Sequence, residues 1–147
     1  MYKHILVPTD GSELSGKAVN VALELAKSVG ARVSAFYATP EVSMVHGEGY
    51  MYGPQGSRTE LVKQRDAHAR ELLESVQKRG EEAGVAIETE HEPSDAPFEA
   101  ILRAAERRKC DLIVMASHGR RGISAVLLGS ETQKVLTHSK LPVLVVR

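Results

Sequence analysis

Short apolar runs alternate with helical patterns along the chain, and this alternation constrains its fold more than any other feature. Five runs with the character of strands lie at residues 5–7, 33–38, 85–91, 112–116 and 142–146. Helical patterns occupy the intervals between them, at residues 14–29, 58–83, 97–105 and 130–139. Strands that alternate with helices in this way predict a parallel sheet with helices on both faces, an α/β fold. Residues 112–116 are apolar throughout, as a central strand buried on both faces requires.

Composition excludes several classes of protein. The length of 147 residues predicts one domain, residues 1–147. Nineteen Lys and Arg balance nineteen Asp and Glu, and aromatic residues make up only 4%, which argues against a nucleic-acid partner. The longest apolar run, residues 112–116, is too short to span a bilayer. A single cysteine, Cys110, excludes an internal disulfide and is compatible with a reducing compartment, so we expect a cytoplasmic protein without a membrane partner.

The segment after the fourth predicted strand carries the clearest sign of a ligand site. Residues 117–129 contain glycines, and residues 130–133 have the pattern of a capping box that opens a helix. Ligands of open α/β sheets bind beyond the carboxyl ends of the strands, and a helix N-terminus there offers unpaired N–H groups to an anion. The Ser130 hydroxyl has two alternative roles, a bond to a phosphate oxygen or a cap on its own helix, and the sequence leaves both open.

The loop after the first predicted strand, residues 8–12, is the second candidate for a ligand site. Asp10 in this loop either caps the following helix, accepts a hydrogen bond from a ribose hydroxyl, or holds a magnesium ion brought by phosphates. Neither loop contains the standard P-loop or dinucleotide-binding signature. Spacing alone therefore predicts an anion site at a helix N-terminus.

Three segments together resemble the universal stress protein family over the whole chain, in order. They are residues 8–12, the loop after the fourth strand, and residues 141–146. The family's nucleotide motif is a glycine, two residues, a second glycine, nine residues, a third glycine, and then Ser or Thr. Here Gly119 is followed by nine residues and then by Gly129 and Ser130, while Ala116 stands at the first glycine position. Alanine is tolerated there at ordinary strand dihedrals, and costly if the position requires a positive φ.

The resemblance implies a five-stranded parallel sheet in the order 3-2-1-4-5, of the adenine nucleotide alpha-hydrolase-like type, that binds ATP. It implies that Asp10 faces the ribose, or a magnesium ion on the phosphates, and that Ala38 meets the adenine through its backbone. The phosphates would be held by backbone N–H groups and the Ser130 hydroxyl. The residues that it assigns to the ligand are Pro8, Thr9, Asp10, Ala38, Met115, Ala116, Gly119, Gly129, Ser130 and Glu131.

No residue of the sequence is predicted to be catalytic, because no nucleophile has an evident base behind it. Ser117 and His118 are adjacent, and neighbours on an extended chain point to opposite faces. His118 either contacts the ligand or packs within its loop, and Arg120 and Arg121 either neutralise phosphate or stay exposed. The histidines lack the spacing of a zinc site.

The apolar character of the last predicted strand indicates a protein partner. Residues 142–146 would form a sheet edge that is apolar on both faces, and such an edge favours pairing with a second copy in a homodimer. The leading hypothesis is a cytoplasmic ATP-binding stress-response protein that acts as a switch or interaction module, with residues 40–57 as a loop that responds to the ligand. The alternatives are a structural or interaction protein of the same fold that binds no nucleotide, and a slow ATPase.

Overall fold

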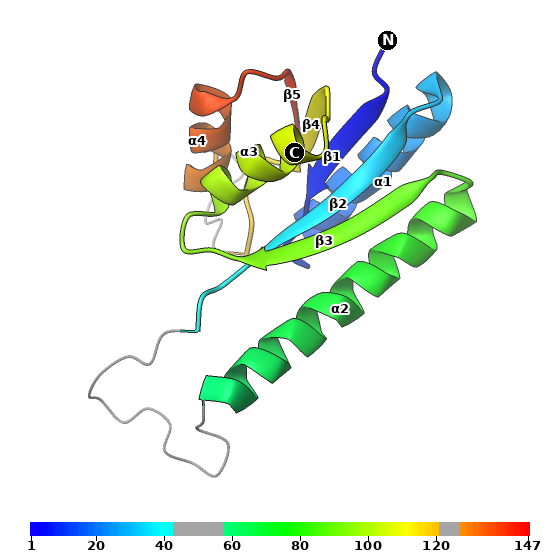
Figure 1. Cartoon of the computed structure of the whole chain (residues 1–147). Coiled ribbons are helices and arrows are strands. Elements are labelled where there is room, and N and C mark those ends of the chain that lie inside the picture. The colour runs from blue at the N-terminus through cyan, green and yellow to red at the C-terminus, as the bar shows by residue number, and fades with distance from the viewer. Residues whose placement is uncertain (43–57, 121–126) are drawn as a thin grey trace.

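A computed structural model describes residues 1–42, 58–120 and 127–147. Its strands form one parallel sheet in the order β3-β2-β1-β4-β5, which confirms the expected architecture (Figure 1). In chain order the elements are β1 His4–Pro8, α1 Glu13–Val29, β2 Arg32–Thr39, α2 Arg58–Ala83, β3 Ile87–Pro93, α3 Pro97–Arg107, β4 Leu112–Ala116, α4 Ser130–His138 and β5 Val143–Val146. The loop predicted at residues 40–57 lies outside the described residues from position 43 onward, as does Arg121. Among the described helices, none has the length and apolar character needed to cross a bilayer.

The helices cover both faces of the sheet because alternate strand residues point to opposite sides. In β1, Ile5 and Val7 face the layer of α1 and α2, whereas Leu6 faces the layer of α3 and α4. All three side chains are fully buried. β4 is buried along its whole length, as its unbroken apolar run predicts.

The ends of α1 follow local sequence signals. Ser12 is the N-cap, and its side chain accepts a hydrogen bond of 3.3 Å from the backbone N–H of Ser15. Gly30 ends the helix with φ at 72°, a left-handed conformation that glycine adopts without steric cost. The cap of α1 is therefore Ser12, and Asp10, the alternative cap, is available for another role.

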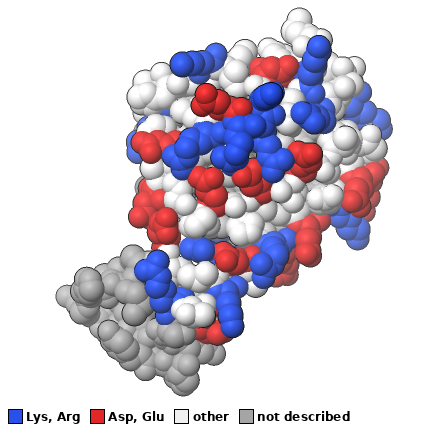
Figure 2. Space-filling model, in the orientation of Figure 1, with Lys and Arg blue, Asp and Glu red and all other residues white. Residues whose placement is uncertain are grey.

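β3 lies at one edge of the sheet and carries a charged face. Its glutamates at 88, 90 and 92 form ion pairs with Arg103 and Arg107 of α3 and with Arg108, the C-cap of that helix. Figure 2 shows basic side chains gathered on this face with acidic side chains directly beside them. A strand of this kind resists pairing with another copy of itself, because like charges would then lie side by side.

Acid should destabilise the fold through His4. His4 is 3% exposed, and its Nε2 lies 2.7 Å from the Ser34 hydroxyl. Burial, together with the positive charge of Arg32, lowers the pKa of His4 below its ordinary value of 6.5. The unfolded chain therefore takes up the proton more readily, so the free energy of unfolding falls as the pH drops below about 6.5.

Thermal unfolding measured between about pH 7.5 and pH 5 tests this expectation. His4→Gln, which keeps a hydrogen-bonding side chain without a titratable ring, should show a smaller loss of melting temperature over the same range. Equal losses in the variant and the wild type would show that His4 does not control the acid response.

Candidate functional site

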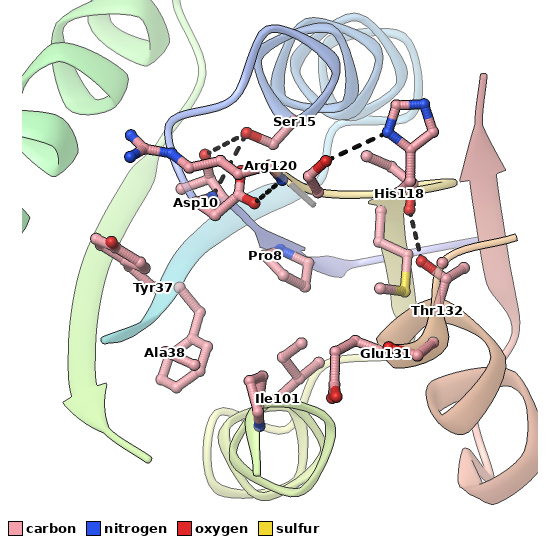
Figure 3. A pocket seen from close by; sticks show the side chains of 18 of the residues that line it. Pro8, Asp10, Ser15, Tyr37, Ala38, Ile101, His118, Arg120, Glu131 and Thr132 are labelled. Atoms are coloured by element: carbon pink, nitrogen blue, oxygen red, sulfur yellow. Dashed lines mark hydrogen bonds between the residues drawn. The ribbon is translucent and has the colours of Figure 1, made fainter. Parts of the chain in front are cut away.

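A cavity of about 550 Å³ lies at the carboxyl ends of the strands, between the loops that follow them (Figure 3). Every residue that the family resemblance assigned to the ligand lines this cavity. The loops after β1 and β4 meet here because β1 and β4 are neighbours in the parallel sheet. The structure thus brings the assigned residues together, while their contacts with a ligand stay a prediction.

Asp10 joins the loop after β1 to the loop after β4. Its Oδ1 accepts a hydrogen bond of 2.9 Å from the backbone N–H of Ser12, and its Oδ2 accepts one of 3.0 Å from the backbone N–H of Arg120. Partial burial alone would raise the pKa of Asp10, but the hydrogen bonds outweigh it and the pKa lies below its ordinary value. Asp10 is therefore an ionised brace between two loops that are 110 residues apart in sequence.

Neighbouring atoms lie so close to the second and third glycines of the motif that a side chain would not fit at either position. A Cβ on Gly119 would collide with Oδ2 of Asp10. A Cβ on Gly129 would lie 3.1 Å from the Cα of His118 and 3.2 Å from the carbonyl oxygen of Ser117. Neither glycine has a positive φ. Absence of a side chain, rather than an unusual backbone conformation, is the reason for glycine at both positions.

Ala116 occupies the first motif position without strain. It is the last residue of β4, where it pairs with Val146, and its φ is not positive. Its carbonyl oxygen accepts a hydrogen bond of 2.9 Å from the Thr132 hydroxyl, which ties α4 to the end of the strand. The replacement of glycine by alanine therefore leaves the cavity wall in place.

The capping box predicted at residues 130–133 is wrong. Gly129 is the N-cap of α4, and its carbonyl oxygen accepts the hydrogen bond of 3.0 Å from the backbone N–H of Gln133. Ser130 is already the first helical residue, so its hydroxyl makes no cap for its own helix. The Gln133 side chain instead donates to the carbonyl oxygen of Leu128, at 3.0 Å. The cavity wall at this point is a helix N-terminus without a side-chain cap, which suits an anion.

The carboxylate of Glu131 stabilises another helix. Its Oε2 accepts a hydrogen bond of 2.9 Å from the backbone N–H of Phe98, in the first turn of α3. The N-cap residue of α3, Ala96, has no side chain that can make this bond. Glu131 thus supplies the missing cap, and only its backbone remains for a ligand.

Residues after β3 also line the cavity, although neither the sequence motifs nor the family resemblance assigned them to the ligand. They are Ser94, Asp95 and Pro97. The sequence held a signal for them, because the carboxyl ends of all parallel strands lie at the same edge of the sheet.

Tyr37, near the end of β2, is a further lining residue that was not assigned to the ligand, and burial raises the pKa of its hydroxyl. His118 and Arg120, which were left between two roles, both line the cavity.

The described residues offer little for metal or nucleophilic chemistry. Within residues 1–42, 58–120 and 127–147, no group of three His, Cys, Asp or Glu side chains is arranged to hold a metal ion. Cys110 is buried against α3, and burial, with a contribution from Asp111, raises its pKa to about 12. Its thiol therefore stays protonated at neutral pH, as an inert core residue does.

Comparison with known proteins identifies the family. The model of the universal stress protein family matches residues 1–147. The chain belongs to the universal stress protein family. A universal stress protein of Methanocaldococcus jannaschii is 37% identical over 147 residues, which are 100% of this chain and 83% of that protein. A universal stress protein of Bacillus subtilis is 32% identical over 149 residues, which cover 100% of this chain and 100% of that protein.

Solved structures of universal stress proteins share the fold. The protein from Lactobacillus plantarum superposes with a TM-score of 0.81 at 26% identity, covering 99% of this chain and 98% of that one. A universal stress protein solved in complex with cAMP has a TM-score of 0.74 at 27% identity, covering 99% of this chain and 97% of that one. Within the family, this chain keeps the later glycines and the serine of the motif and replaces the first glycine by Ala116.

Proposed function

We propose that this universal stress protein binds an adenine nucleotide, with ATP as the main ligand, and acts in the cytoplasm as a nucleotide-dependent switch or interaction module. The observation that carries the proposal is the uncapped N-terminus of α4 at the wall of an open cavity braced by Asp10. The relative solved with cAMP supports the same class of ligand. Residues 1–147 would form a single functional domain.

The chemistry of the lining suits the parts of a nucleotide. Backbone N–H groups of Gly129, Ser130 and Glu131, with the Ser130 hydroxyl, would hold phosphate oxygens at the positive end of the α4 dipole. Apolar side chains on the opposite side of the cavity would pack against a base. Asp10 would face the ribose, or a magnesium ion that the phosphates bring with them.

Calorimetric titration with ATP, with and without magnesium, tests this proposal. We expect saturable binding and a higher melting temperature, because a ligand at about 100 times its Kd adds about 2.7 kcal/mol to the free energy of unfolding. A titration in the presence of a chelator shows whether magnesium contributes to the affinity for ATP. Neither heat nor thermal stabilisation at millimolar nucleotide would refute the proposal.

We also propose a homodimer through residues 142–146. β5 is an edge strand, and its Leu144 is 41% exposed. The opposite edge, β3, carries glutamates along one face, which disfavours self-pairing there. A two-fold pairing of β5 with its copy would cover the exposed leucine.

Sedimentation at micromolar concentration tests the dimer. The wild type should sediment as a dimer, and Leu144→Lys should shift it to the monomer. Val29→Lys, at an exposed position near the end of α1, is the matched control and should leave the dimer intact. A monomeric wild type would rule out this assembly.

A further inference from the structure

The cavity has two chemically different ends. Beyond β4 lie the backbone N–H groups at the start of α4. At the end of β2 lie the apolar side chains of Ala38 and Pro40. In the sheet β1 lies between β2 and β4, so the two ends are two strand spacings apart, roughly 10 Å, and accept different parts of one extended ligand. A flat heterocycle fits the apolar end when the anion lies against α4.

Three carboxylates line the cavity, and two of them already have partners. Both oxygens of Asp10 accept backbone N–H groups. Glu131 accepts the N–H of Phe98 and lies 3.4 Å from the Lys134 ammonium. The side chain of Asp95 makes no hydrogen bond or ion pair within the part of the chain that the structure describes. It is the carboxylate left with unused acceptors.

The local structure places Asp95 at the apolar end. The backbone N–H of Ser94 donates a hydrogen bond of 2.9 Å to the carbonyl oxygen of Thr39, which extends the pairing of β3 with β2 by one residue. Asp95 and Pro40 are the next residues on the two chains, and both line the cavity. The Ser94 hydroxyl accepts a hydrogen bond of 3.1 Å from the N–H of Ala96, so the turn that carries Asp95 is held on both sides.

We propose that Asp95 selects the base of the nucleotide, an inference that rests on the proposed function. An ionised carboxylate only accepts hydrogen bonds. It therefore favours a base with an exocyclic amino group, such as the 6-amino group of adenine, and repels a carbonyl oxygen at the same position. A hydrogen bond to a charged group is stronger than a neutral one, so the preference for a 6-aminopurine over a 6-oxopurine is on the order of tenfold or more.

The test compares ATP with ITP, which carries a carbonyl oxygen in place of the 6-amino group. Calorimetric titration of the wild type should give a Kd for ATP lower by about tenfold or more. Asp95→Ala should bring the two values to within about threefold, and Asp95→Asn, whose amide also donates, should strengthen ITP binding. Because Asp95 is exposed, the variants should melt at the wild-type temperature.

Glu99→Gln is the matched control, because it removes one exposed carboxylate from the first turn of α3 outside the cavity lining. It should leave the ratio of the two Kd values unchanged. Equal binding of ATP and ITP by the wild type, or an unaltered ratio in Asp95→Ala, would overturn the inference and leave the nucleotide-binding proposal standing. Failure of the wild type to bind either nucleotide would overturn both.

Discussion

Gly119→Ala is expected to weaken ATP binding by at least about tenfold while the chain still folds. The new Cβ would collide with Oδ2 of Asp10, so the carboxylate must move and Oδ2 loses its hydrogen bond from the N–H of Arg120. That bond joins the loop after β1 to the loop after β4 at the cavity. The effect should appear in calorimetric titration as a loss of affinity, with a smaller change in melting temperature because Gly119 is exposed.

Two further variants separate this mechanism from a general effect of adding a methyl group. Gly16→Ala makes the same change inside α1, where the nearest atom to the new Cβ is Nη1 of Arg79 at 3.9 Å, and ATP affinity should not change. Asp10→Ala removes the obstructing carboxylate, so Gly119→Ala should weaken binding far less in that background than in the wild type. Wild-type affinity in the single Gly119→Ala variant would contradict the role of Asp10 as a brace.

Gly80→Ala should lower the free energy of unfolding by about 2 kcal/mol, although alanine is the better helix former. Gly80 lies in α2, where a Cβ would collide with Cγ2 of Ile87 at the start of β3. Overpacking of this kind costs about 1–3 kcal/mol, and we expect the upper part of that range because the obstructing atoms belong to a β-branched side chain. The gain in helix propensity, about 1 kcal/mol, offsets only part of the cost.

Urea denaturation of paired variants measures this effect. Gly16→Ala, also within a helix but with only an ordinary contact of 3.9 Å for the new methyl, should stabilise the chain by up to about 1 kcal/mol, so the same substitution has opposite signs at the two positions. Ile87→Ala removes the obstructing Cγ2, and the double variant should be more stable than the sum of the single changes predicts. A stabilised Gly80→Ala variant would show that α2 moves away from β3 without cost.

Local patterns in the sequence predicted most of the fold. The unbroken apolar run at residues 112–116 indicates a strand buried on both faces, and Gly30 marks the end of α1. The parallel direction of the strands follows from their alternation with helices. The family resemblance supplied the order of the strands across the sheet. The same resemblance named cavity-lining residues, because the glycine spacing between 119 and 129 is a property of a short continuous segment.

Contacts between distant residues were decided by the tertiary structure. The sequence assigned a capping box to Ser130, whereas the close packing of Gly129 against residues 117 and 118 places the helix start one residue earlier. The bond from Phe98 to Glu131 depends on how α3 and α4 pack together, and no local pattern encodes it.

Short-range periodicity, caps and turns thus determined where the strands and helices lie, because they depend on residues a few positions apart. Tertiary structure decided which long-range bonds pair the polar atoms at the cavity. Asp10 and Asp95 are both acidic residues in loops after parallel strands, yet Asp10 has both oxygens bonded and Asp95 has none bonded to any described residue. The bond to Oδ1 of Asp10 is local, from Ser12, whereas the bond to Oδ2 exists because the fold brings residue 120 beside the first of these loops.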